Sequence, residues 1–178
     1  NRLAGTSGND VIDARGGDDR VYAYSGDDRI DGGQGQDEIY GGSGNDRIDG
    51  EQGRDRLFGG SGDDRIDGGQ GDDLIVGGTG ADRLTGGSGD DVVRFLSGAD
   101  SNDVITDFGR GDDLIDLAAM GFTGLAEATH FAAGRTLIWH YDGGNTVIRD
   151  DTDGNFATAE FRLTLEGRVD LDRGDFIL

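Results

Sequence analysis

The sequence contains no cysteine, no proline and no lysine. Without cysteine the chain can form no disulfide bond and has no thiol for catalysis. It also lacks any run of about 18 apolar residues, so we expect no membrane-spanning helix. The first ten residues, NRLAGTSGND, lack the apolar segment of a signal peptide. The fold of this chain must therefore be stabilised by something other than disulfides.

Positive charge and hydrophobicity are also scarce. The chain has 16 basic residues against 37 acidic ones, a formal net charge of −21 and a mean hydropathy of −0.54. Such a chain lacks the basic patches that nucleic acid and anionic membranes require. Its composition is close to that of disordered segments. The excess of acid predicts that the chain binds cations.

Glycine is abundant and recurs with a fixed period. From Gly5 to Arg94 the chain divides into ten consecutive units of nine residues, with no insertion. Position four is Gly and position six is Asp in every unit, and position eight is always aliphatic. The position-eight residues are Ile12, Val21, Ile30, Ile39, Ile48, Leu57, Ile66, Ile75, Leu84 and Val93. A flexible Gly/Asp-rich linker would not keep this aliphatic position, so the pattern indicates a folded repeat.

The nine-residue period is too short for a helical repeat. We expect positions one to six to form a glycine-rich turn and positions seven to nine a short strand, with the position-eight side chain pointing inward. Two units then make one coil of 18 residues, and neighbouring coils stack about 4.8 Å apart. The predicted fold is all-β: a right-handed parallel β-roll of two sheets filled by aliphatic residues.

The aspartate at position six indicates how so thin a core is stabilised. The period places Asp46 beside Asp64, for example, and therefore stacks like charges. Carboxylate oxygens and turn carbonyls are the hard oxygen ligands that Ca²⁺ prefers. We therefore expect cations between the turns, where they remove the repulsion and supply the missing stability.

The unit pattern GGxGxDxUx resembles the Ca²⁺-binding nonapeptide of RTX (hemolysin-type) proteins over residues 5–94. The resemblance implies a parallel β-roll with Ca²⁺ between consecutive turns on the same side. It also implies the ligands: the Asp and the carbonyls of positions two and four from the earlier turn, and the Asp and the carbonyls of positions one and three from the later turn. Two such sets are Gly42, Gly44, Asp46, Gly59, Ser61 and Asp64, and Gly33, Gly35, Asp37, Gly50, Gln52 and Asp55.

Ten units imply eight sites, or nine if Asp100 continues the row. Eight calcium ions would bring the net charge from −21 to about −5. The first three units depart from the Gly-Gly start, at Thr6, Ala14-Arg15 and Ala23-Tyr24. The expected metal-binding residues of the repeat are Gly5, Ser7, Gly8, Asp10, Gly17, Asp19, Ala23, Ser25, Gly26, Asp28, Gly32, Gly33, Gln34, Gly35, Asp37, Gly41, Gly42, Ser43, Gly44, Asp46, Gly50, Gln52, Gly53, Asp55, Gly59, Gly60, Ser61, Gly62, Asp64, Gly68, Gly69, Gln70, Gly71, Asp73, Gly77, Gly78, Thr79, Gly80, Asp82, Gly86, Ser88 and Asp91.

The residues on either side of position eight point outward and differ between the two sheets. The odd-numbered units place an arginine row beside an aspartate row, for which we expect cross-strand charge pairing. These rows are Arg29, Arg47, Arg65 and Arg83, and Asp13, Asp31, Asp49 and Asp67. The even-numbered units carry an aromatic stripe with two arginines: Tyr22, Tyr40, Phe58, Arg20 and Arg56. Either this face packs under the C-terminal segment or a neighbouring domain, or it stacks against the sugars of an anionic polysaccharide.

After Arg94 the repeat ends and large apolar residues become frequent. Residues 136–141 and 146–150 flank an Asp-Gly-Gly-Asn turn and predict a β-hairpin. A further strand is expected over residues 159–165. We expect residues 101–178 to form a β-rich cap on a roll formed by residues 1–100.

The segments DVITDF, GDDLIDL, YDGGNTVIRDDTDGN, EFRLTLEG and DFIL resemble the C-terminal region of serralysin-type metalloproteases. The same region occurs in secreted lipases and in alginate (mannuronan) C5-epimerases, whose R-modules it also resembles. The resemblance implies a further Ca²⁺ at Asp107 and Asp113; the alternative is that both are solvated acids at strand ends. It also implies that the terminal DFIL (175–178) ends a type I secretion signal, while the same residues can form a final core strand.

No catalytic pattern accompanies the repeat, because the sequence has neither HExxH nor GxSxG and its two histidines are isolated. We interpret the chain as a noncatalytic Ca²⁺-binding module at the C-terminus of a secreted bacterial protease, lipase or epimerase. Its expected partners are calcium ions, an N-terminal catalytic domain and the type I secretion apparatus of a Gram-negative bacterium. Two alternatives stay open: a polysaccharide-binding R-module of a mannuronan C5-epimerase, and a fragment of an adhesin or surface layer.

Overall fold

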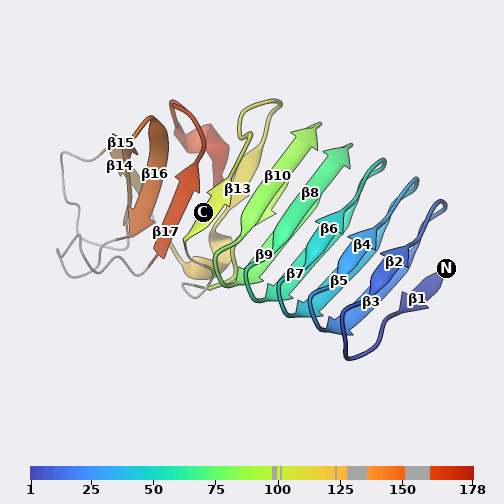
Figure 1. Cartoon of the computed structure of the whole chain (residues 1–178). Coiled ribbons are helices and arrows are strands. Elements are labelled where there is room, and N and C mark those ends of the chain that lie inside the picture. The colour runs from blue at the N-terminus through green and yellow to red at the C-terminus, as the bar shows by residue number, and fades with distance from the viewer. Residues whose placement is uncertain (98–99, 101, 123, 128–135, 151–160) are drawn as a thin grey trace.

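The computed structural model describes residues 1–97, 100, 102–122, 124–127, 136–150 and 161–178. Within this part of the chain, successive coils stack into a flat roll with one sheet on each side (Figure 1). In spatial order, the eight-stranded sheet contains β1 (Arg2–Ala4), β3 (Arg20–Ser25), β5 (Glu38–Ser43), β7 (Arg56–Ser61), β9 (Leu74–Thr79), β11 (Val92–Arg94), β13 (Leu114–Asp116) and β18 (Phe176–Ile177). The ten-stranded sheet contains β14 (Gly124–Glu127), β15 (Thr136–Asp142), β16 (Asn145–Asp150), β17 (Phe161–Leu165), β12 (Asp103–Ile105), β10 (Arg83–Ser88), β8 (Arg65–Gln70), β6 (Arg47–Asp49), β4 (Arg29–Asp31) and β2 (Val11–Asp13).

The pairing register confirms the two-unit coil. Strands pair in parallel with partners 18 residues apart, as in Ile30 with Ile48 on one sheet and Ile39 with Leu57 on the other. From Val21 to Leu84 each position-eight side chain is at most 1% exposed. The predicted fold class, a parallel β-roll with a single aliphatic row behind each sheet, is therefore confirmed.

The strands are longer than the sequence analysis predicted. In β3, β5, β7, β8, β9 and β10 the strand continues from positions seven to nine into positions one to three of the next unit. The reason is that the backbone hydrogen bonds between neighbouring coils continue into the turn. The Gly44 N–H, for example, donates to the Ser61 carbonyl at 2.9 Å. The prediction of a six-residue turn was therefore wrong, and positions four to six make the sharp part of the turn.

The C-terminal third extends both sheets. β12 pairs with β10, and β13 pairs with β11, both in parallel. The predicted hairpin is confirmed as the antiparallel pair β15–β16, and the predicted strand that follows is observed from Phe161 as β17. Two short 3-10 helices, η1 (Ala118–Met120) and η3 (Arg173–Asp175), complete the described elements. No helix in this part of the chain is long and apolar enough to cross a membrane.

The outer faces differ from expectation in two respects. The arginine row is present in register, but no described ion pair joins Arg29, Arg47 or Arg65 to the aspartate row. The 18-residue period explains this, because it sets Arg opposite Arg and Asp opposite Asp. On the other sheet the aromatic stripe is not packed under the last strand, because β18 extends the far edge of that sheet.

Candidate metal sites

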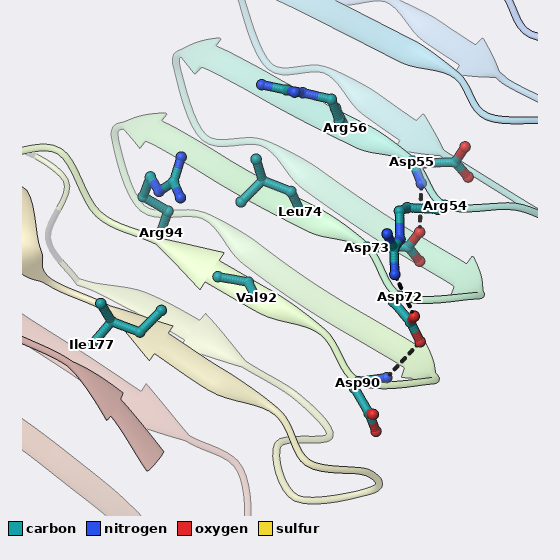
Figure 2. Close-up of a pocket in the computed structure, with 10 residues that line it drawn as sticks. All are labelled: Arg54, Asp55, Arg56, Asp72, Asp73, Leu74, Asp90, Val92, Arg94 and Ile177. Atoms are coloured by element: carbon teal, nitrogen blue, oxygen red, sulfur yellow. Dashed lines mark hydrogen bonds and ion pairs between the residues drawn. The ribbon is translucent and has the colours of Figure 1, made fainter. Parts of the chain in front are cut away.

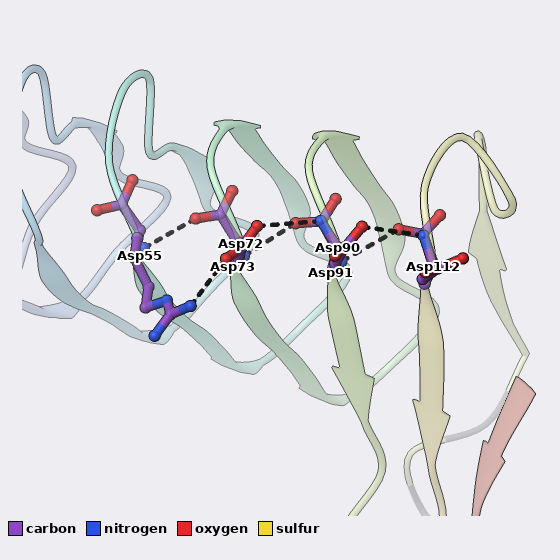
Figure 3. Close-up of polar contacts among 8 residues, drawn as sticks. Asp55, Asp72, Asp73, Asp90, Asp91 and Asp112 are labelled. Atoms are coloured by element: carbon purple, nitrogen blue, oxygen red, sulfur yellow. Dashed lines mark hydrogen bonds and ion pairs between the residues drawn. The ribbon is translucent and has the colours of Figure 1, made fainter.

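The position-six aspartates form two rows, one along each edge of the roll where the chain turns, and all of them except Asp10 are buried. Figure 3 shows part of one row, with Asp55, Asp73 and Asp91 in successive turns. In each row the Oδ1 of one Asp accepts the backbone N–H of the Asp one coil earlier, at 2.7–2.9 Å. The Asp46 N–H thus donates to Asp64 Oδ1 at 2.7 Å. The rows are Asp10, Asp28, Asp46, Asp64 and Asp82, and Asp19, Asp37, Asp55, Asp73 and Asp91.

The second oxygen of most of these carboxylates has no hydrogen-bond partner in the part of the chain that the structure describes. The buried Oδ2 atoms without a hydrogen bond belong to Asp19, Asp28, Asp37, Asp46, Asp55, Asp64, Asp73 and Asp82. These eight side chains are at most 3% exposed. An unpaired buried carboxylate oxygen is costly, and such atoms are rare in folded proteins. A regular series of them indicates that each row is completed by cations.

Turn carbonyls lie beside the unpartnered oxygens. A Cβ built on Gly41 would lie 2.4 Å from Asp46 Oδ2 and 2.7 Å from the Gly59 carbonyl oxygen. In the units that begin at residues 5, 32, 50, 59 and 68, a Cβ built at position one would likewise meet the position-six Oδ2 of its own unit and the position-one carbonyl oxygen of the next coil. At these six positions glycine leaves the space free, whereas the units that begin at Ala14 and Ala23 have a methyl group there. The carboxylate of one turn and the position-one carbonyl of the next are hard donors of the type Ca²⁺ takes.

Burial raises the pKa of the row aspartates from Asp37 to Asp91, because a buried carboxylate loses the water that stabilises its charge. The hydrogen bond with the N-terminal amine instead lowers the pKa of Asp19. Burial raises the pKa of Asp64 to about 7 and that of Asp55 to about 6. The same cause raises the pKa of Asp73, Asp82 and Asp91 to about 6. Neighbouring carboxylates, such as Asp46 and Asp82 around Asp64, add to the effect. A bound divalent cation would reverse this shift.

A second ladder runs along position five, and the sequence analysis missed it. In this ladder the Oδ1 of a position-five side chain accepts the position-five N–H of the following coil at 2.8–3.2 Å. In the position-six rows the Oδ1 accepts the N–H of the preceding coil, which is the opposite direction. The accepting residues are Asn9, Asp27, Asn45, Asp63, Asp18, Asp72 and Asp90. Each turn is thus held from both sides. The signal in the sequence was weak, since this position also contains Gln36, Arg54 and Ala81.

One end of each row, at Asp10 and at Asp113, is satisfied by protein donors. Asp10 Oδ2 accepts from the Thr6 N–H at 2.6 Å and from its hydroxyl at 2.9 Å. Asp113 continues the other row, with Oδ1 accepting from the Asp91 N–H and Oδ2 from the Gly109 N–H. The two Asp107 oxygens accept from the N–H groups at residues 86 and 87. Asp107 and Asp113 therefore bind to different turns, and their role as calcium ligands stays a prediction.

The row that begins at Asp10 continues at Asp103 and not at Asp100. Asp103 is fully buried, and its Oδ1 accepts the Asp82 N–H at 2.8 Å. Asp100 instead closes its own loop, accepting from the N–H groups of Leu96 and Ser97 and from the Ser97 hydroxyl. Three extra residues separate Asp82 from Asp103, which is why the nine-residue period did not reveal it.

The aromatic stripe is a parallel stack along the eight-stranded sheet. Tyr22 and Tyr40 lie 5.0 Å apart, and Tyr40 and Phe58 4.7 Å apart, with nearly parallel rings. Arg20 forms an ion pair with Glu38, and the Glu38 carboxylate also accepts a hydrogen bond from the Tyr40 hydroxyl.

The same sheet carries a shallow cavity of about 350 Å³ (Figure 2). Its lining consists of three arginines, four aspartates and three apolar residues: Arg54, Arg56, Arg94, Asp55, Asp72, Asp73, Asp90, Leu74, Val92 and Ile177. Arg56 has no ion-pair partner among the described residues. The four aspartates in the lining do not favour an anionic ligand in this cavity.

The family model for the RTX calcium-binding nonapeptide repeat matches four overlapping stretches: residues 4–39, 22–57, 40–75 and 67–101. The chain belongs to this RTX family. Calcium binding by the repeat is therefore shown, and the unpartnered carboxylate oxygens of the RTX roll fit that ion.

Known relatives of this RTX chain come from Azotobacter vinelandii. Mannuronan C5-epimerase AlgE5 is 41% identical over 86 residues, which are 46% of this chain and 8% of that protein. Alginate lyase 7 is 38% identical over 86 residues, 46% of this chain and 9% of that protein. The solution structure of the AlgE6R2 subunit of a mannuronan C5-epimerase is similar with a TM-score of 0.56 and 30% identity, covering 75% of this chain and 87% of that one. The expected resemblance to epimerase R-modules is confirmed, and the chain spans less than a tenth of the curated proteins.

Proposed function

We propose that the RTX chain is a noncatalytic module of a larger secreted bacterial enzyme, and that it folds when it binds calcium outside the cell. The observation that carries the proposal is the series of eight buried carboxylate oxygens in the two rows that have no partner among the described residues. The division into a roll, residues 1–100, and a cap, residues 101–178, is part of the proposal. So is the absence of catalysis, which the lack of HExxH and GxSxG supports.

The proposed ligands follow the carboxylate rows. Asp46 and Asp64 would hold one ion together with the Gly59 carbonyl, whose oxygen lies beside Asp46 Oδ2. The Ser61 carbonyl already accepts the Gly44 N–H and has a second lone pair for the ion. The equivalent sets in the other coils give about eight ions, one for each pair of stacked turns.

Calcium would act as a switch between an unfolded and a folded chain. When calcium is scarce, the aspartate rows repel one another and the aliphatic core is too thin to offset them. Extracellular calcium modules bind at about 10⁻⁴–10⁻³ M, so secretion into a calcium-rich medium would load the turns. Because the sites exist only in the folded chain, binding free energy becomes folding free energy.

Export by a type I apparatus belongs to this proposal. An unfolded chain suits a narrow export channel, and the resemblance of the terminal DFIL to secretion signals supports the route. In the structure Phe176 is buried in β18, which pairs with β13, so these residues also form the expected final strand.

Circular dichroism and hydrodynamic radius, measured with calcium and with excess chelator, test the proposed switch. We expect a compact β-rich chain with calcium and an expanded, disordered one without it. Magnesium at the same concentration is the control, because it prefers stricter octahedral geometry and keeps its water. A chain that is equally compact and β-rich in chelator would rule the switch out.

A second candidate function is binding of an anionic polysaccharide such as alginate. It is favoured by the three exposed arginines Arg29, Arg47 and Arg65, which lie one coil apart, about 4.8 Å, without ion-pair partners among the described residues. The named substrates of the relatives, mannuronan and alginate, support it. Binding of this kind should weaken with salt.

Titration of alginate oligomers into the calcium-loaded chain at low and high salt tests this second function. We expect the variant R29Q/R47Q/R65Q to bind more weakly than R15Q/R110Q/R173Q, which removes the same charge elsewhere. A variant R56Q tests the eight-stranded sheet, where the aromatic stripe offers the alternative surface. The second function is wrong if the unmodified chain shows no binding at low salt.

A further inference from the structure

The point where the repeat ends carries a feature that no nonapeptide predicts. The strand pairing continues across it, with Arg83 opposite Val104 and Leu84 opposite Ile105, an offset of 21 residues instead of 18. Within the turn Gly80 bridges Asp100, an offset of 20. The chain therefore inserts residues in the turn and still returns Asp103 to the place of a position-six aspartate.

Asp103 has the same environment as the aspartates of the repeat. It is 0% exposed, its Oδ1 accepts the Asp82 N–H at 2.8 Å, and its buried Oδ2 has no hydrogen-bond partner among the described residues. Asp82, one coil earlier, is 1% exposed and also has an unpartnered Oδ2. The geometry that marks the metal sites of the roll is thus repeated outside the nonapeptides.

No ion pair among the described residues balances the charge at this junction. Asp100 is 4% exposed and lies close enough to Asp82 and Asp103 for its charge to act on both. No arginine forms a described ion pair with any of the three carboxylates. Burying three acids together without a cation is strongly unfavourable. Either the junction holds a cation, or one of the acids stays protonated.

We propose that a calcium ion binds between the turns of Asp82 and Asp103 and joins the roll to the C-terminal strands of the ten-stranded sheet. This inference rests on the proposed calcium-dependent folding and adds a ligand, Asp103, that the repeat does not contain. Asp82 and Asp103 supply the carboxylate oxygens, and Asp100 adds a third negative charge while it holds the loop. Because β12 also pairs with β17, the ion would couple calcium loading to order in the C-terminal strands.

The variant D103N separates the two explanations of the buried acids. Asparagine keeps an oxygen for the Asp82 N–H but removes the charge, as protonation would. The matched control is D142N, which removes one charge from an exposed position at the end of β15. The number of calcium ions bound per chain is measured after equilibrium dialysis against a buffer in which calcium is the only divalent cation. The fluorescence of Trp139, the single tryptophan, follows the folding of β15 and the neighbouring C-terminal strands during a calcium titration.

We expect D103N to bind one calcium ion fewer than the unmodified chain and to need about tenfold more calcium for the Trp139 transition. We expect D142N to change neither quantity. If D103N keeps the full ion count and the same transition, Asp103 is a neutral acid and the proposal is wrong. A chain that binds no calcium at all would instead overturn the proposed function.

A second variant keeps the test decisive if D103N does not fold at any calcium concentration. D103E retains the charge but moves the carboxylate by one methylene group. For a ligand we expect a weaker site, seen as a higher calcium requirement for Trp139. An unchanged requirement in D103E would overturn the assignment.

Discussion

A single aspartate in an RTX row has two different tasks. Asp46 Oδ1 holds the backbone of the preceding turn through the Asp28 N–H, while its Oδ2 points to the space where the ion would bind. The Asp49 carboxylate, three residues later, belongs to the outer row of the ten-stranded sheet and is only partly buried. Identical residues in one unit therefore differ in function because of the face on which they lie.

Replacing Asp46 should disturb calcium binding, whereas replacing Asp49 should not. Asp46→Ala removes a ligand from the two ions it would bridge and leaves the Asp28 N–H without its acceptor. We expect the calcium midpoint to rise by about tenfold or more and the cooperativity to fall. Calcium titration by circular dichroism measures both. Superimposable titrations of D46A and D49A would contradict the assignment of the position-six row.

The position-one glycines are needed for space and not for flexibility alone. In Gly41→Ala the new Cβ would meet Asp46 Oδ2 and the Gly59 carbonyl at distances that real Cβ atoms do not show. We expect about 1–3 kcal/mol of destabilisation in saturating calcium. Gly16→Ala is the control, because its nearest neighbour would lie at an ordinary 3.6 Å, so it should be neutral or slightly stabilising. Chemical unfolding with calcium compares the two, and equal losses would refute the steric explanation.

At the scale of the strand and turn, the two side-chain ladders bind neighbouring coils in opposite directions. The position-six bonds run from each N–H to the following coil, and the position-five bonds run back to the preceding one. The position-five ladder is broken on one side, because Gln36 and Arg54 stand where Asn or Asp would accept. Stability should therefore vary along the roll.

Changes at position five should shift stability in both directions. Asn45→Ala removes the acceptor of the Asp63 N–H, and we expect a loss of about 0.5–1.5 kcal/mol, whereas Asn45→Asp keeps the acceptor and should be neutral. Gln36→Asn places an acceptor beside the Arg54 N–H and should stabilise the chain. Thermal unfolding in saturating calcium measures these effects. Position five has no structural role if N45A and N45D behave alike.

The sequence predicts those parts of the fold that follow from its period. Identical residues 18 positions apart indicate the coil, the aliphatic row and the aspartate rows. The longer strands were missed, because Gly-Gly at positions one and two is typical of a turn while its backbone still pairs with the next coil. Asp103 was missed because insertions break the period, although the strand pairing restores the register. The hairpin β15–β16 was predicted from its turn residues, which act locally.

At the scale of the whole molecule, the roll buries a large part of its negative charge. Ordinary proteins keep most of their acids exposed, whereas here the position-six aspartates lie behind the turns at a few per cent exposure. The aromatic stack and the arginine row then remain as the outer features of the two sheets. Folding is limited by the electrostatics of the interior, and calcium or protons can both relieve it.

The stability of the calcium-free chain should consequently fall as the pH rises from about 4 to about 7. Burial raises the pKa of Asp64 and Asp103 to about 7, from an ordinary value of 3.8. Well below pH 3.8 these groups are protonated in both the folded and the unfolded state and do not change the stability. Between the two values the unfolded chain releases their protons and the folded chain retains them, so the unfolded state gains. In chelator we therefore expect residual β-structure at about pH 4 and little at pH 7, measured by circular dichroism.

With calcium the trend reverses, because protons compete with the ion for the same oxygens and the calcium midpoint should rise as the pH is lowered. A calcium-free chain whose β-content is independent of pH across this window would show that the buried carboxylates do not limit folding.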